Sequence, residues 1–203
     1  MRAILKSLFL LVCFVVPCLA QETPEWQLFG GYSLQRAGVR QYFKTTPIIY
    51  TFRNDSVFMS GVEFSATENR NRWFGGTLDV SAYFGTPEVA GISNQQRIYS
   101  ILYGPNFSIP THGGTAELFH GGNLFAHALF GAAHSSVHVT PTGPHASDFA
   151  FNMALGGGFD IPLRTDISIR VLQADYMRTT TFSSGRNNFR FSAGVVFNSG
   201  RVK

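Results

Sequence analysis

Four ionisable residues, Glu63, Asp79, Asp175 and Arg190, occupy polar positions in segments that otherwise alternate with large apolar residues. Glu63 and Asp79 are symmetric about Asn71 in a short polar stretch, so the two carboxylates are expected almost opposite each other on neighbouring strands. Asp175 and Arg190 are symmetric about a later loop and are expected to form a cross-strand ion pair. We therefore predict a buried ionic network in which Arg190 or Arg170 reaches the acidic pair. A proton-active or catalytic carboxylate pair is the alternative interpretation.

The histidines are the other residues that could do chemistry. All 6 lie between His112 and His145, and His134, His138 and His145 share one predicted outer loop or its base. No cysteine or clustered carboxylate joins them and no helix spaces them, so we predict no metal and no other cofactor. His134 with Ser135 and Ser136 would suit a lipid-modifying barrel enzyme, but no acid is placed to orient the histidine. We therefore predict no catalysis.

The clearest structural element lies between Phe149 and Ile161. Large apolar residues occupy every odd position except Gly157, and the even positions are small or polar. This period of two predicts a β-strand that separates an apolar medium from a tight polar space. No helix pattern follows Gly156, Gly157 and Gly158, so the three glycines are expected to allow close packing in the wall and not to bind phosphate.

Seven further segments alternate in the same way. The eight predicted strands are Trp26 to Leu34, Met59 to Thr67, Trp73 to Phe84, Arg97 to Ile109, Leu124 to His134, Phe149 to Ile161, Ile167 to Arg178 and Asn188 to Phe197. The seventh changes parity after Val171, which predicts a bulge. The longer connections, roughly 35 to 56, 85 to 96, 135 to 148 and 179 to 187, are all expected on one rim. This pattern predicts an all-β protein, an eight-stranded antiparallel up-and-down transmembrane β-barrel.

The volume of the barrel decides which face points inward. The large side chains of eight strands would overfill so narrow an interior, so they are expected to face lipid and the polar face to line the lumen. Large aromatic residues collect near the strand ends and predict two girdles. Those near the short turns are Trp26, Trp73, Phe107, Phe159 and Phe197, and those near the other ends are Tyr83, Tyr99, Phe149, Tyr176 and Phe189.

The first residues predict export. Arg2 and Lys6 precede an apolar run and then Pro17 to Ala20, the pattern of a signal peptide over residues 1–20, with the barrel domain over 21–203. Cys13 and Cys18 both fall in this leader, so no disulfide is expected. Without Arg2 and Lys6, the 16 Lys plus Arg fall to 14 against 12 Asp plus Glu, a net charge of +2 that gives no argument for nucleic acid. Only 14% of the residues are charged, whereas 20 are Phe and 21 are Gly, which fits a sheet that faces lipid.

Four segments, Leu28 to Ser33, Asn71 to Gly75, Ala128 to His134 and Asn188 to Gly194, resemble the small bacterial outer-membrane β-barrel family with the OmpA-type transmembrane domain. The last strand, with Ser192, Gly194 and Phe197, also resembles the barrel-assembly signal of this family. The resemblance implies an outer-membrane location in a Gram-negative envelope, with outer-membrane lipid and the barrel-assembly machinery as partners.

The expected function is a structural or surface-interaction role through the extracellular loops, whose ligand the sequence does not identify. Two alternatives stay open, a narrow pore and a lipid-modifying barrel enzyme. The expected ionic network would plug the lumen, which disfavours the pore.

Overall fold

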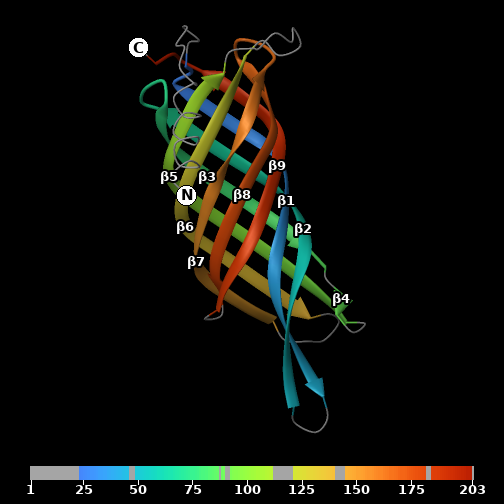
Figure 1. Cartoon of the computed structure of the whole chain (residues 1–203). Coiled ribbons are helices and arrows are strands. Elements are labelled where there is room, and N and C mark those ends of the chain that lie inside the picture. Colours follow the sequence, from blue (N-terminus) through green and yellow to red (C-terminus); the bar gives the residue numbers. More distant parts are fainter. Residues whose placement is uncertain are drawn as a thin grey trace, which may run out of the picture.

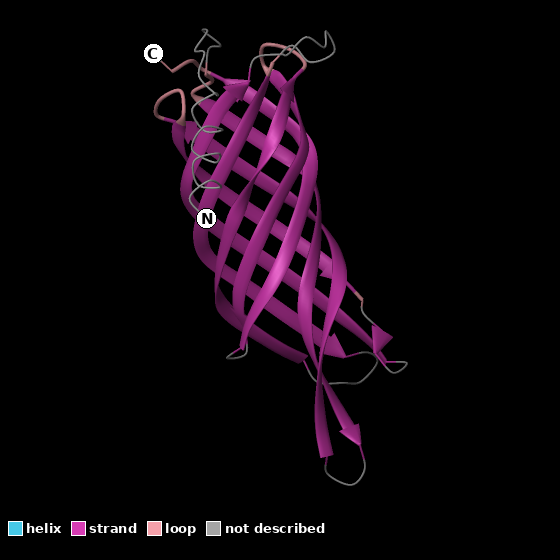
Figure 2. Ribbon diagram, in the orientation of Figure 1, coloured by secondary structure: helices cyan, strands magenta, loops and turns pink. Residues whose placement is uncertain are grey.

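The chain forms a closed, tilted β-barrel in a computed structural model that describes residues 23–45, 49–86, 88–89, 92–111, 121–139, 145–181 and 184–202 (Figures 1 and 2). Consecutive strands pair antiparallel in the order β3-β2-β1-β9-β8-β7-β6-β5, and a β3–β5 pairing closes the ring. The prediction of an eight-stranded antiparallel barrel is therefore confirmed. Within these residues, no helix is long and apolar enough to cross a membrane.

The eight barrel strands are β1 (Trp26–Thr45), β2 (Ile49–Asn69), β3 (Phe74–Gly85), β5 (Ile92–Thr111), β6 (Gly122–Val139), β7 (His145–Pro162), β8 (Ile167–Thr181) and β9 (Ser184–Ser199). The two-residue β4 (Glu88–Val89) pairs only with the start of β5. The predicted signal peptide, residues 1–20, lies outside the described residues.

The barrel has two different rims. At the proximal rim, which is uppermost in Figure 1, lie the β2–β3 and β7–β8 turns and both described ends of the chain, where the Val202 amide donates to the Thr23 carbonyl at 3.0 Å. The distal rim carries the β1–β2, β3–β5, β6–β7 and β8–β9 connections, and the β1–β2 hairpin projects well past it. These are the four connections that were expected to share one rim.

The prediction that residues 35–56 form a long loop is wrong. β1 continues to Thr45 and β2 begins at Ile49, and the two stay in register as far as the Thr45–Ile49 pair. Strands also extend into the predicted loops at 85–96, 135–148 and 179–187. An outer-membrane crossing needs only about 9–11 strand residues, so these extensions lie beyond an apolar layer and have no reason to alternate.

The predicted bulge in the seventh strand is confirmed. Arg170 pairs with Gly194 of β9, and Gln173 pairs with Ser192. Val171 and Leu172 of β8 therefore lie opposite the single residue Ala193 of β9. On the other side, Asp160 and Phe159 of β7 pair with Arg170 and Leu172, which leaves Val171 unmatched. The extra residue reverses the parity of the strand, and both Arg170 and Gln173 can therefore face inward.

The two faces of the wall differ in composition. Buried positions are mainly polar, whereas Phe, Leu, Val, Ile, Tyr and Trp dominate the exposed positions. On the outward face, Glu68 lies near the proximal rim, and Arg36, Arg97 and Arg178 lie in the distal half. The described outward-facing positions between these two levels carry no Asp, Glu, Lys or Arg. The barrel is therefore apolar outside and polar inside.

Candidate functional site

The centre of the lumen is organised around Arg190, which is completely buried. Its Nε donates to Asp175 Oδ2 at 2.7 Å and its Nη1 donates to Asp79 Oδ1 at 2.9 Å. Glu63 Oε2 lies 3.5 Å from the same Nε and also accepts a hydrogen bond from Ser192. One guanidinium thus contacts all three of the carboxylates that were expected in the lumen.

Strand register brings these groups together. Asp175 lies directly opposite Arg190 on the β8–β9 ladder. Glu63 and Asp79 are not opposite each other, contrary to the expectation, because Glu63 pairs with Ser81 and Asp79 pairs with Ser65. The pairs of this ladder are symmetric about the residue that follows Asn71. The two carboxylates are therefore offset diagonally, and each of them contacts Arg190.

His127 and Gln173 belong to the same network, although the sequence did not identify them. His127 Nε2 lies 2.8 Å from Asp175 Oδ1, and Gln173 Nε2 donates to both Glu63 Oε1 and Asp175 Oδ2 at 2.8 Å. His127 is on β6 and Asp175 is on β8, and Gly156 of β7 lies between them in register. Because Gly156 has no side chain, the imidazole can reach across a whole strand.

A second ionic cluster lies on the proximal side of the first. Arg170 Nε and Nη2 donate to the two carboxylate oxygens of Asp160 at 2.8 and 3.1 Å. The guanidinium carbon lies 4.3 Å from the centroid of the Phe29 ring and 4.1 Å from that of Phe125. Arg170 is thus held between two inward-facing phenylalanines by cation–π contacts and contacts neither Glu63 nor Asp79.

Two apolar clusters lie in the lumen on the distal side of the charges. One cluster comprises Leu102, Leu129, Ala154 and Met177, and the other comprises Ala37, Met59, Tyr83 and Ile98. On β2, β3, β6 and β8 these residues are two to four positions farther from the proximal rim than Glu63, Asp79, His127 and Asp175. The charged centre therefore lies between an Arg170 layer and an apolar layer.

The other candidate residues are not assembled into a site. His134 faces outward and stacks on Phe149 with centroids 4.4 Å apart, whereas Ser135 is buried on the inward face. A strand cannot join side chains on its opposite faces, so His134 and Ser135 form no nucleophile–base pair. Ser136 shares the outward face with His134, but His134 Nδ1 has no hydrogen-bond partner. The described residues contain no group of three or more His, Cys, Asp or Glu placed to hold a metal ion, and His112 and His120 lie outside the described residues.

Except for Tyr83, the aromatic residues of the expected girdles lie on the outward face. Trp26, Trp73, Phe159 and Phe197 are near the proximal rim, and Phe149, Tyr176 and Phe189 are in the distal half. Tyr83 was wrongly expected among them, because it faces the lumen with 0% exposure and its hydroxyl lies 3.0 Å from that of Ser33. Its parity with Asp79 and Ser81 places it on the polar face of β3.

The barrel has the fold of known eight-stranded barrels. A crystal structure of Ail, the attachment invasion locus protein of Yersinia pestis, matches with a TM-score of 0.53 and 18% identity over 86% of this chain and 99% of that chain. Ail in complex with the heparin analogue sucrose octasulfate matches with a TM-score of 0.53 and 17% identity over 86% and 99%. Neisserial surface protein A matches with a TM-score of 0.56 and 12% identity over 86% and 97%. At these identities the likeness concerns the fold alone. No protein-family profile and no curated protein matches the sequence.

Proposed function

We propose that this protein is an integral outer-membrane barrel without catalytic activity, and that its distal rim interacts with molecules outside the cell. The observation that carries the proposal is the uncharged, Phe-rich outer wall around a filled polar interior. In water this wall would expose an apolar surface far larger than the few hundred Å² that soluble monomers tolerate. In a membrane the same wall faces lipid, and the barrel leaves no open sheet edge.

The interior supports a scaffold better than a pore. Arg190 and its three carboxylates fill the centre, and the Leu102–Met177 cluster adds an apolar barrier beyond it. Water and ions pass poorly through a lumen that is both filled and apolar at one level. The lipid-modifying alternative loses support because Ser135 lies on the opposite face of β6 from His134, and His134 Nδ1 makes no hydrogen bond to Ser136 on its own face.

Features of the distal rim support a role in surface interaction. The β1–β2 hairpin extends past the rest of the barrel (Figure 1), and Arg36, Arg97 and Arg178 are exposed in the distal half. Ail, which has the same fold, is named for attachment and invasion and has been crystallised with a sulfated saccharide. We propose anionic surface polymers as the first ligand class to test for this chain.

Membrane fractionation combined with heated and unheated gel electrophoresis tests the barrel. We expect the protein in the outer-membrane fraction and a folded band that migrates differently from the heat-denatured band. A soluble protein, or identical migration in both lanes, would contradict the proposal.

Two further experiments test the role. Retention on immobilised heparin should fall when Arg36, Arg97 and Arg178 are all replaced by glutamine, and equal retention would remove anionic polymers from the proposal. A deletion strain should keep its lipid profile. An altered profile that the wild-type gene restores and the His134→Ala gene does not would instead support the enzyme.

A further inference from the structure

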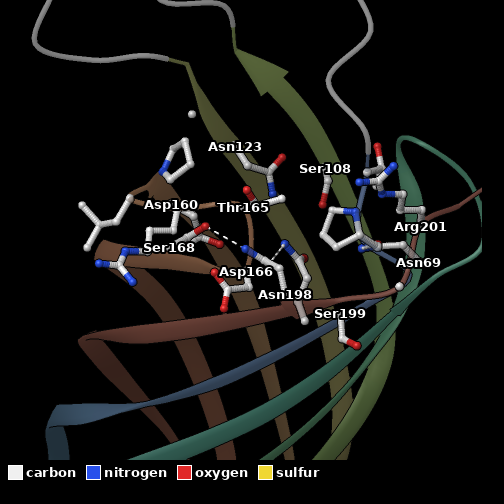
Figure 3. A pocket seen from close by; sticks show the side chains of 18 of the residues that line it. Asn69, Ser108, Asn123, Asp160, Thr165, Asp166, Ser168, Asn198, Ser199 and Arg201 are labelled. Atoms are coloured by element: carbon white, nitrogen blue, oxygen red, sulfur yellow. Dashed lines mark hydrogen bonds between the residues drawn. The ribbon is translucent and has the colours of Figure 1, made fainter.

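A groove of about 450 Å³ lies on the outer face of the barrel wall near the proximal rim. This size falls in the range of small-ligand sites. Strands β2, β3 and β5 form the groove, and the side chains and backbone that line it include Glu68, Arg70, Phe74, Gly76, Tyr103 and Pro105. It is separate from the proximal cavity, which has about 740 Å³, is open at the barrel mouth, and is lined by Asn123, Asp160 and Asn198 among others (Figure 3).

Strand register explains why the wall is recessed here. Gly76 of β3 pairs with Glu68 of β2 and with Pro105 of β5. Gly76 has no side chain, whereas the rows on either side carry large rings, Phe74 toward the rim and Tyr103 away from it. A depression with aromatic walls therefore opens in a surface that large apolar side chains otherwise cover.

Three polar groups are accessible at this depression. Arg70 Nη1 donates to Glu68 Oε1 at 3.1 Å, and the two side chains are 74% and 41% exposed. The Tyr103 hydroxyl leans over Gly76, since a Cβ at this glycine would lie 2.9 Å from the hydroxyl oxygen. Within the described residues, this hydroxyl makes no hydrogen bond. An acid, a base and a hydroxyl donor therefore border one apolar groove.

Neighbouring tryptophans indicate the level of the groove in the membrane. Trp26 lies beside Glu68 in the β1–β2 ladder, and Trp73 directly precedes Phe74. Both tryptophans are exposed on the outward face. Tryptophan is enriched where the hydrocarbon of a membrane meets the lipid headgroups. The charged pair thus lies at the level of the headgroups, and Tyr103 starts one row deeper in the apolar band.

The adjacent opposite charges favour a zwitterionic headgroup. An anionic headgroup would be attracted by Arg70 and repelled by Glu68, whereas a headgroup with an ammonium beside a phosphate can match both. A primary ammonium also donates hydrogen bonds to a carboxylate, which a trimethylammonium group cannot do. Arg70 uses one N–H for Glu68, and a guanidinium has five, so others can bind a phosphate.

The geometry points to a binding site for one phospholipid with a phosphoethanolamine headgroup. Its ammonium contacts Glu68, its phosphate contacts Arg70, and the Tyr103 hydroxyl donates to an ester oxygen, while one acyl chain lies in the groove. This inference rests on the proposed membrane location and not on the ligand proposed for the distal rim. Short turns of bacterial outer-membrane barrels face the periplasm, so the lipid would belong to the inner leaflet.

Native mass spectrometry of the detergent-solubilised full protein tests this site with phosphatidylethanolamine, phosphatidylcholine and phosphatidylglycerol that carry identical acyl chains. We expect phosphatidylethanolamine to bind about five-fold more tightly than either of the other lipids. Glu68→Gln should remove most of this preference. Glu25→Gln changes an exposed glutamate at the same rim that does not line the groove, and it should leave the preference intact.

Gly76→Leu tests the groove without a change in charge. The new side chain would fill the depression and displace the Tyr103 phenol, so phosphatidylethanolamine binding should fall at least five-fold. Position 76 faces outward, and the folded, heat-modifiable band should therefore persist.

A folded barrel that binds none of the lipids, binds all three equally or prefers phosphatidylglycerol would overturn the site. Unchanged phosphatidylethanolamine binding in Glu68→Gln or in Gly76→Leu would also overturn it. A wild-type protein without a heat-modifiable band would instead contradict the barrel proposal itself.

Discussion

Arg190 is the residue on which the charge balance of the lumen depends. It is fully buried and contacts Asp79, Asp175 and Glu63. A buried ion pair adds little net stability over an apolar replacement, but removal of one partner leaves buried charge uncompensated. We therefore expect Arg190→Met to lower the free energy of unfolding by about 3–5 kcal/mol. Urea unfolding in detergent micelles, followed by the shift of the folded gel band, measures this change.

Two variants control for the loss of a large side chain. Arg178→Met removes an exposed arginine from the next strand and should leave the urea midpoint unchanged. Adding Asp79→Asn and Asp175→Asn to Arg190→Met removes two of the three carboxylate charges that lose Arg190 and should recover part of the loss. An Arg190→Met protein that unfolds at the wild-type urea concentration would contradict the ionic network.

Gly156 is the residue that lets His127 reach Asp175. A Cβ at this position would overlap Asp175 Oδ1 and the Ala174 carbonyl, so Gly156→Ala must displace the acceptor of the imidazole. We expect a loss of about 1–3 kcal/mol in unfolding free energy and a change in the His127 ring signals in NMR spectra. Gly30→Ala is the matched control, because its Cβ would meet only the Phe64 ring, at 3.2 Å. Equal effects of the two substitutions would argue against this role of Gly156.

The residue pairs show how far the sequence could predict the site. Symmetry about a turn was sufficient for Asp175 and Arg190, and the same reasoning applied to the 162–166 turn would have found Asp160 and Arg170. This reasoning could not predict His127, because its imidazole crosses Gly156 and contacts Asp175 on a strand that does not pair with β6. Such a contact depends on the closed shape of the barrel and not on any single ladder.

At the scale of the strands, the sequence predicts which side chains face inward and which face outward wherever one side of the wall is apolar. Strands β3 and β9 alternate as expected along their length. The outer part of the β1–β2 hairpin has no such pattern, because both of its faces lie beyond the apolar band. The two strands of this part pair because they continue the β1–β2 ladder, and no local sequence pattern indicates that continuation.

The bulge in β8 gives a prediction about register. Val171 has no cross-strand partner on either side, so its deletion restores simple alternation and leaves Arg170 and Gln173 facing inward. Deletion of the paired Ala174 instead turns one half of the strand over and moves Asp175 or Gln173 to the lipid face. We expect the Val171 deletion to give a folded, heat-modifiable band and the Ala174 deletion to give none. Failure of both, or success of both, would show that the register is fixed elsewhere.

Considered as a whole, the molecule has an interior in three layers. From the proximal rim inward these are the cavity above Asp160, the two ionic clusters of Arg170 and Arg190, and the apolar clusters around Met59 and Met177. The layers have different effects on transport. The proximal cavity is open at the barrel mouth, whereas the apolar clusters are expected to interrupt a column of water.

This layering predicts the electrical behaviour of the barrel. In planar bilayers the wild-type protein should give no stable channels, and Arg190→Ala should also stay closed because the apolar layer remains beyond the charges. Replacing both Leu102 and Met177 by alanine removes two of the three large side chains of one apolar cluster and should allow measurable conductance when combined with Arg190→Ala. Large, stable channels in the wild type, or in Arg190→Ala alone, would show that the apolar layer does not seal the lumen. Each variant is compared at equal amounts of the folded, heat-modifiable band, so that an unfolded fraction is not counted as a closed barrel.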